Sequence, residues 1–357
     1  MLTIHEPFHG AVLSHRHGVQ HEEGLTLAVV GEAPLERRVL VNGIEAEREG
    51  ERFEAVITLT EPEEDITAVC DGTLGRLEHT VRVVWDRDSR KRYRFSIDDN
   101  SFWLRDVATE RYDSLFDCFY MGMLKDFNDR YGAKFVLNIY YETDDGWQLP
   151  DFPEDYRGEF EDNADWLALS CHAHANLPDR PYQYAPAQKL IGDIETVEEQ
   201  IRRFAGEQTL APPTVIHWGM VLPQALPALA EHGVRVLSGS FRRSSHGHDV
   251  HYWQDDERCE WLARNEALKD FETGLVFSNI DLCGNRVPLD EIEPQLEAIA
   301  ADFRRTEIMD LFTHEQYFWP FYRNYLPDHA DRLNTMIRWV TENGYEPVFF
   351  HEGFLGI

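Results

Sequence analysis

The sequence predicts an α/β protein in which a small antiparallel β-sandwich of the immunoglobulin-like type precedes a distorted (β/α) barrel of seven or eight strands. Before residue 86, short apolar-alternating runs are separated by Gly, Asn-Gly and Asp-Gly turn signals, which is typical of antiparallel strands. After the segment WDRDSRKRYRF (85–95), strand-like runs alternate with amphipathic helical stretches, which indicates parallel βα units. We therefore expect a sandwich domain over residues 1–88 and a barrel domain over residues 89–357.

The first domain is predicted from its strands. Each run alternates apolar and polar residues over a strand length, and turn residues follow it. No motif in this domain indicates catalysis. The runs are LTLAVVG (25–31), RRVLVNGIEAE (37–47), RFEAVITL (52–59), DITAVCDG (65–72) and HTVRVVW (79–85).

The second domain is predicted from alternating strands and helices. Seven or eight such repeats match the size of a (β/α) barrel. We expect strands at residues 92–98, 133–140, 166–172, 213–218, 234–240, 274–281, 307–314 and 346–350. We expect helices within residues 114–132, 193–206, 222–233, 291–305 and 330–344.

Composition limits the partners and the compartment. The net charge of −31 argues against nucleic acid and anionic membranes as partners, because both require basic surfaces. No stretch approaches the roughly 20 apolar residues of a membrane span, and the segment MLTIHEPFHG lacks the features of a targeting signal. The five cysteines show no CxxC spacing, so we expect a reducing cytoplasm as the compartment. A homo-oligomer stays open.

Polar residues gather where the predicted barrel strands end. Because side chains alternate along a strand, Ser96 and Asp98 point into the barrel, and so do His172 and His174. Active sites of such barrels lie at the carboxyl ends of the strands. The candidates at these ends are Asp98, Asp99, Asn138, Tyr140, His172, His174, His217, Trp218, Asp281, His314, Glu315, His351 and Glu352.

This set of carboxylates and imidazoles predicts a metal site. Carboxylate and imidazole together bind Zn²⁺, Mn²⁺, Fe²⁺, Co²⁺ or Ni²⁺, and three protein ligands leave a position open for water. Structural roles are the alternative for each piece. Asp98 and Asp99 fit a solvated turn or a helix cap, the two histidines of LSCHAHAN fit a core position, and FTHEQYFWPFY fits an aromatic packing segment.

The segments RYRFSIDDN, LSCHAHANLPDRPY, TVIHWG and DLFTHEQYFWP occur in an order that resembles the polysaccharide deacetylase-like proteins, the NodB-homology fold of the carbohydrate esterases. The resemblance covers roughly residues 90–357. It implies that Asp98 is the general base, that Asp99 binds the metal, and that His314 is the general acid. It also implies metal ligands in the histidine-rich second motif.

The second motif departs from the family pattern. The family spaces its two metal-binding histidines four or five residues apart, whereas His172 and His174 are two apart. We therefore expect the metal to be held by Asp99 and His172, with His174 or His217 as the third ligand.

The resemblance implies hydrolysis of an acetylated sugar or polysaccharide by a metal-activated water. Glu315 is a further catalytic candidate, and the substrate-binding candidates are Asn138, Tyr140, Trp218, Asp281 and Tyr317. Two other functions stay open. A glycoside hydrolase would use two of the four carboxylates Asp98, Asp99, Glu142 and Glu315, and a non-catalytic protein would bind sugar without turnover.

Overall fold

The computed structural model describes residues 1–72, 75–242 and 251–356. The chain divides into two compact units. The first contains Met1–Arg90, Ala267–Val276 and Leu355–Ile357, and the second contains Lys91–Glu266 and Phe277–Phe354. In the described ranges, every helix is too short or too polar to cross a membrane.

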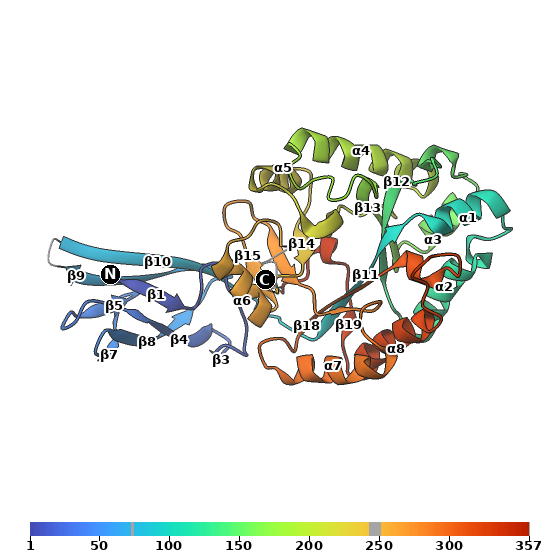
Figure 1. The fold of residues 1–357 in the computed structure, drawn as a ribbon. Coiled ribbons are helices and arrows are strands. Elements are labelled where there is room, and N and C mark those ends of the chain that lie inside the picture. The colour runs from blue at the N-terminus through green and yellow to red at the C-terminus, as the bar shows by residue number, and fades with distance from the viewer. Residues whose placement is uncertain (73–74, 243–250, 357) are drawn as a thin grey trace. The chain divides into compact units, whose positions relative to one another are not determined.

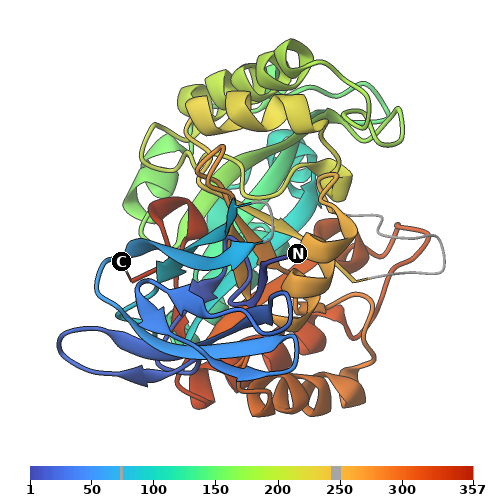
Figure 2. The ribbon, with the colours of Figure 1, turned by 90° about the vertical axis from the view of Figure 1, so that its left-hand side faces the viewer.

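The first unit contains two five-stranded sheets, drawn in blue in Figures 1 and 2. One sheet has the order β1-β4-β8-β7, with β3 paired to β4, and the other has the order β2-β10-β9-β5-β6. Apart from the parallel pair β10 and β2, the strands within each sheet are antiparallel. The bounds are β1 Thr3–Glu6, β2 Val12–Leu13, β3 Val19–Gln20, β4 Leu25–Glu32, β5 Val39–Val41, β6 Ile44–Glu45, β7 Glu47–Glu49, β8 Arg52–Leu59, β9 Glu63–Gly72 and β10 Gly75–Trp85; β15 is Ala267–Lys269.

Alternation explains why these segments form strands. Along β4 and β8, buried residues alternate with more exposed ones, as expected when one face of a sheet packs on a core and the other faces water. Each of the five runs expected from the sequence includes residues of one to three of these strands. The short segments β1, β2 and β3 were not expected, because they are too short to show a period.

The second unit is built on a parallel sheet with the order β13-β12-β11-β18-β17, in which β19 also pairs with β11. A smaller pair consists of β14 and β16. The bounds are β11 Arg92–Asn100, β12 Phe135–Glu142, β13 Leu167–Ala175, β14 Val236–Gly239, β16 Val276–Asn279, β17 Leu282–Cys283, β18 Ile308–His314 and β19 Glu346–Pro347.

Helices flank these strands. In Figure 1, α4 and α5 lie on one side of β11, β12 and β13, and α7 and α8 lie on the opposite side. The bounds are α1 Phe102–Glu110, α2 Phe119–Tyr131, α3 Arg157–Asp162, α4 Ala187–Phe204, α5 Leu226–Glu231, α6 Asp256–Arg264, α7 Leu289–Ala301 and α8 His329–Glu342. Short 3₁₀ turns are η1 Leu115–Asp117, η2 Leu149–Asp151, η3 His217–Gly219, η4 Pro223–Ala225, η5 Glu315–Phe318 and η6 Phe350–Glu352.

The expected barrel stays a prediction, because the described ladders do not form a closed ring of strands. Single backbone hydrogen bonds do continue the path beyond β13. Ala211 donates to Leu169, Ser238 donates to Thr214, and Ile280 donates to Gly239, at 2.8, 2.8 and 2.9 Å. Asp281 then donates to Asp310 of β18 at 2.8 Å. These bonds are what a strongly distorted barrel requires.

The strand expected at residues 213–218 is wrong. An isolated bridge joins Leu169 to Leu210, which precedes this segment. The segment itself continues into the 3₁₀ turn η3. Pro212 and Pro213 lack backbone N–H groups, so they cannot donate to a ladder. The apolar run Val215–Ile216 is buried without strand pairing.

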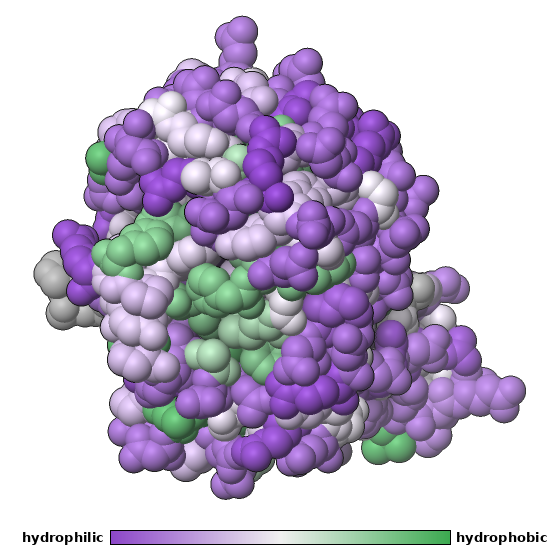
Figure 3. Space-filling view, turned by 90° about the vertical axis from the view of Figure 1, so that its right-hand side faces the viewer, coloured by the Kyte–Doolittle hydropathy of each residue, from purple (hydrophilic) through white to green (hydrophobic). Residues whose placement is uncertain are grey.

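An apolar area lies on the outside of the second unit. Phe119 at the start of α2 is 49% exposed and Phe321 is 61% exposed. Their rings contact Trp319 at centroid distances of 4.6 and 5.5 Å. Figure 3 views the side on which α1 and α2 lie in Figure 1 and shows a continuous green area bordered by polar residues.

Candidate metal centre

The end of β11 carries two adjacent aspartates that both line one cavity. Neighbouring residues of a regular strand point to opposite faces. Here the pairing of β11 with β12 shifts between Ile97 and Asn100, and Asp99 has a φ of 61°. A bulge of this kind redirects a side chain, and aspartate tolerates the left-handed region better than most residues do. The bulge therefore turns Asp99 toward the same space as Asp98.

A second bulge separates the two histidines of β13. Ile139 pairs with Cys171, but the next residue, Tyr140, pairs with Ala173. His172 is thus an extra residue that reverses the alternation after it. His172 lines the cavity, whereas the His174 ring stacks on Tyr141 at a centroid distance of 4.8 Å. The structure does not bring His174 to the site.

The third residue of the cluster comes from a tight turn. His217 is the first residue of η3, and the next residue, Trp218, has a φ of 65°. The backbone N–H of Gly219 donates to the carbonyl of Ile216 at 2.6 Å. The turn places a buried imidazole beside β13.

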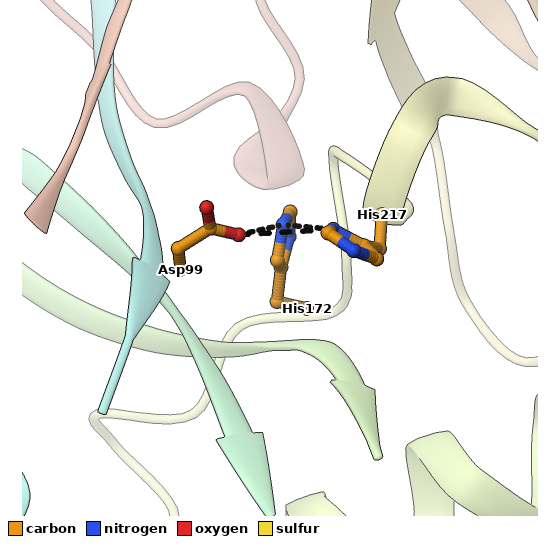
Figure 4. Close-up of side chains that lie close together, drawn as sticks. All are labelled: Asp99, His172 and His217. Carbon is orange, nitrogen blue, oxygen red and sulfur yellow. Dashed lines mark hydrogen bonds and ion pairs between the residues drawn. The ribbon is translucent and has the colours of Figure 1, made fainter. Parts of the chain in front are cut away.

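Asp99, His172 and His217 point toward one another, with His172 in the middle (Figure 4). The Nε2 atom of His172 lies 3.1 Å from Oδ1 of Asp99 and 2.9 Å from Nδ1 of His217. The Nδ1 atom of His217 lies 3.7 Å from the same Oδ1. Three potential ligand atoms thus surround one small volume.

This cluster fits a divalent transition metal. Its ligand atoms all lie within 4.8 Å of one another. Ligands about 2.1 Å from a tetrahedral ion are about 3.4 Å apart, and the three observed separations lie on both sides of that value. Two imidazoles and one carboxylate suit zinc, iron and the other metals of the expected set, and they leave at least one position open. The identity of the metal stays a prediction.

The protonation states of the cluster suit the binding of a cation. Burial raises the pKa of Asp99, but the hydrogen bond from His172 and the charges of the nearby histidines outweigh burial and hold that pKa well below its usual range. Burial also lowers the pKa of His217 to about 3, with a further contribution from His172. Asp99 is therefore ionised and His217 neutral near pH 7, and these are the forms that bind metals.

The surroundings of His172 raise its pKa. Burial lowers its pKa, but the hydrogen bond to Asp99 and the charges of Asp98 and Asp99 outweigh burial and raise it. The Nδ1 atom of His172 is buried and has no hydrogen-bond partner in the described ranges. Metal-binding histidines usually donate from their second nitrogen, so this ring lacks the usual outer support.

Tyr140 supports the cluster from β12. Its hydroxyl donates a short hydrogen bond to Oδ1 of Asp99 and lies 3.3 Å from Nδ1 of His217. Burial, together with Asp99, raises the pKa of Tyr140 far above its ordinary value. The phenol therefore stays protonated and acts as a donor that orients the carboxylate.

Asp98 is held by hydrogen bonds within the sheet. Its Oδ1 accepts from Nδ2 of Asn138 at 2.7 Å and from the Ser96 hydroxyl at 3.3 Å. Ser96 in turn accepts from Arg94 at 2.7 Å, and Arg94 forms a fully buried ion pair with Asp310. Arg94, Ser96 and Asp98 lie on the face of β11 that was expected to point inward. Their hydrogen bonds fix one oxygen of Asp98, and Asp98 still lines the cavity.

His314 faces the same cavity from the end of β18. Its Nδ1 atom lies 2.8 Å from Oδ1 of Asn285. An amide oxygen accepts, so Nδ1 carries the hydrogen, and Nε2 is the nitrogen available to exchange a proton. The charge of His314 also acts on Asp99, which places it near the cluster.

The cavity has a volume of about 390 Å³. Among the residues expected at the site, Asp98, Asp99, His172, His217, Trp218, Asp281 and His314 line it. Asn138 and Tyr140 are absent from the lining and act through hydrogen bonds to the two aspartates. The remaining candidates, His174, Glu315, Tyr317, His351 and Glu352, are also absent from the lining.

Glu315 has a structural environment. It is fully buried, and its carboxylate accepts from the backbone N–H groups of Ser101, Phe102 and Trp103 at 2.7, 2.9 and 2.6 Å. The indole of Trp319 donates to it at 3.0 Å. These amides belong to the start of α1, where N–H groups lack helical partners. Glu315 therefore caps α1 from a distant strand end.

Asp281 is already paired. One oxygen lies 2.5 Å from Arg305 and the other accepts from the backbone N–H of Asp310 at 2.9 Å. Burial raises its pKa to about 6 against the effect of Arg305. Asp281 therefore holds Arg305 and the backbone of β18 in place.

Sequence reasoning missed several polar residues of the site. Asn285 orients His314, and Arg242 and Arg286 line the cavity. Arg242 and Asn285 follow short strands that are four and two residues long, so no periodicity marked their ends. The signal available in the sequence was the position of NR (285–286) soon after DLC (281–283).

The comparisons with known proteins assign no family. No protein-family model matches the chain, and no curated protein matches it. Among solved structures, an engineered protein is 18% identical over 24% of this chain and 20% of its own, with a TM-score of 0.18. The titin domains Z1Z2 in complex with telethonin are 11% identical over 28% of this chain and 58% of theirs, with a TM-score of 0.18.

Proposed function

We propose that the protein is a metal-dependent hydrolase that removes acetyl groups from a sugar or polysaccharide. The observation that carries the proposal is the cluster of Asp99, His172 and His217, whose ligand atoms lie within 4.8 Å of one another, in a cavity that Asp98 and His314 also line. The resemblance of the sequence motifs to the polysaccharide deacetylase-like proteins gives the acetylated substrate.

The mechanism assigns one role to each residue. Asp99, His172 and His217 would hold a divalent ion, which supplies a Lewis acid that acidifies water and polarises a carbonyl oxygen. Asp98 is the general base, because it lines the cavity while its Oδ1 is fixed by Asn138. His314 is the general acid.

Proton transfer follows from these positions. Asp98 accepts a proton from the attacking water, and Nε2 of His314 delivers a proton to the leaving oxygen or nitrogen of the sugar. Asn285 accepts from Nδ1 of His314, which leaves Nε2 to carry the proton that is transferred. Tyr140 holds the Asp99 carboxylate in place.

The first experiment measures bound metal and acetate release together. Protein purified without added metal is assayed for metal content and for acetate release from acetylated sugars, before and after chelation. We expect near-stoichiometric metal, and activity that chelation removes and Zn²⁺, Mn²⁺, Fe²⁺, Co²⁺ or Ni²⁺ restores. Asp99→Ala should lose both. His174→Ala is the matched control, since this neighbouring histidine points away from the site.

Three outcomes would contradict the proposal. A protein that takes up none of these metals after incubation cannot use the proposed chemistry. Activity on glycosidic bonds that survives chelation would favour a glycoside hydrolase, although Glu142 and Glu315 do not line the cavity. Sugar binding without turnover in the metal-loaded protein would favour the non-catalytic alternative.

A further inference from the structure

The cavity wall carries two kinds of charge. Metal-binding residues and Asp98 come from β11, β13 and η3, whereas Arg242 follows β14 and Arg286 follows β17. Both arginines line the cavity with His314. The site thus combines a predicted metal cluster with two guanidinium groups.

The carboxylates of the wall's aspartates contact groups other than the side chains of these two arginines. Asp98 accepts from Asn138 and Ser96, and Asp99 accepts from Tyr140 and His172. Asp281 forms its ion pair with Arg305, which lies outside the lining. Each carboxylate therefore already has donors.

Neither arginine has an acidic partner in the described ranges, which omit residues 243–250. Arg242 donates to the backbone carbonyl of Asp281 at 3.2 Å, and no ion pair with a described carboxylate involves Arg242 or Arg286. The chain has 65 acidic and 34 basic residues, so acidic partners are abundant. In a chain with this excess of acidic residues, two arginines that line one cavity without a described acidic partner are unusual.

A further cation, Arg305, lies near Arg242. Partial burial and the charge of Arg305 lower the pKa of Arg242, against the opposing effect of Asp281. Positive charges beside a low-dielectric wall attract anions more strongly than the same charges in open water do. Guanidinium groups also bind carboxylate, sulfate or phosphate through two parallel hydrogen bonds.

We propose that Arg242 and Arg286 bind an anionic group of the substrate, so that the substrate is an acetylated sugar that carries a carboxylate, a sulfate ester or a phosphate ester. This inference rests on the function proposed above. Trp218 and Phe312, which line the same cavity, provide aromatic surface for the sugar itself.

The test compares sugars that differ mainly in charge. Dissociation constants are measured by titration calorimetry at low salt for glucose, glucuronate, glucose 6-sulfate and glucose 6-phosphate. We expect at least one anionic sugar to bind the metal-loaded protein about tenfold or more tightly than glucose, because a hydrogen bond to a charged group is worth that factor. The preferred anion identifies the group.

Variants assign the preference to the two arginines. The double variant Arg242→Gln/Arg286→Gln should lose the preference, and Arg235→Gln should retain it, because Arg235 is exposed and absent from the lining. Asp99→Ala should also retain it, since the arginines do not depend on the metal. Equal binding of all four sugars would overturn the proposal. So would a preference that the double variant keeps, or one that only Asp99→Ala removes.

The two proposals fail separately. Metal content and acetate release from a neutral acetylated sugar, both measured on the wild-type protein, report the hydrolase function, and the series of charged sugars reports the anionic substrate. An unchanged metal content with no anion preference would refute only the anionic substrate. Anion binding in a protein that takes up no metal would refute only the hydrolase.

Discussion

Two carboxylates lie at the ends of neighbouring strands, and their surroundings differ. Asp99 is on β11 and Glu315 follows β18, and these strands pair so that Asp98 is opposite His314. Asp99 faces two imidazoles and a phenol, and its pKa is held below its usual range. Glu315 faces three backbone amides, and burial raises its pKa to about 7 despite those donors.

The comparison shows that an acidic residue at a strand end is not by itself a site. What decides its role is the local backbone after the strand. The bulge at the end of β11 directs Asp99 into the cavity, whereas η5 directs Glu315 toward the first turn of α1. The predictions below test this division between a metal-binding and a structural carboxylate.

The largest effect is expected for Asp99→Asn, which keeps the shape and removes the charge. Loss of a direct ligand should lower metal affinity by more than the 10–100-fold that outer partners contribute, and acetate release should fall to background. Metal titration and urea unfolding of the same preparation check this. A variant that binds metal as tightly as the wild type would remove Asp99 from the ligand set.

A smaller loss is expected for Asp98→Asn. The amide cannot accept a proton from water, so kcat should fall by about 10²- to 10⁴-fold. Metal content should stay at the wild-type level, because Asp98 is outside the cluster of potential ligands. Loss of metal in this variant would instead identify Asp98 as a ligand.

Glu315→Gln should affect stability and leave the metal in place. Gln has one acceptor oxygen where the carboxylate serves four donors, so buried N–H groups lose their partners. We expect the free energy of unfolding to fall by about 2 kcal/mol. Urea unfolding measures this change, and metal titration of the folded variant is its control. Weaker metal binding with an unchanged free energy of unfolding would instead assign Glu315 to the metal site and not to the capping of α1.

The sequence was sufficient for much of the sheet. Alternation placed Ser96 and Asp98 on one face of β11, and in the structure the Ser96 hydroxyl donates to Oδ1 of Asp98. His217 was named as one of two alternatives for the third ligand. Strand length and polar residues at strand ends were the signals that worked.

The errors come from single inserted residues and from prolines. A rule of alternation placed His172 and His174 on one face, but one extra residue in β13 separates them. No local pattern announces such a bulge, because it depends on pairing with β12. The same holds for Glu315, whose partners lie more than 200 positions earlier in the chain.

The contrast between the two carboxylates extends to two histidines. His172 beside Asp99 has a raised pKa. His329, whose ring packs on Phe318 of η5 at a centroid distance of 4.2 Å, has its pKa lowered to about 3, first by burial and then by Arg332. A buried neutral histidine destabilises the fold in acid, because the unfolded chain takes up the proton first.

Acid should therefore weaken the fold through His329. Its ordinary pKa is 6.5 and its folded pKa is about 3, so the unfolded state binds more protons between these values, and stability falls as the pH falls below 6.5. At pH 5.5 this single group costs about 1.4 kcal/mol. His329→Gln, which can keep the hydrogen bond to Thr313, should reduce the stability difference between pH 7.5 and 5.5 by that amount in urea unfolding. An unchanged stability difference would mean that His329 takes up its proton in the folded state as readily as in the unfolded state. The environment of His329 beside Glu315 would then favour the protonated ring, as the environment of His172 does.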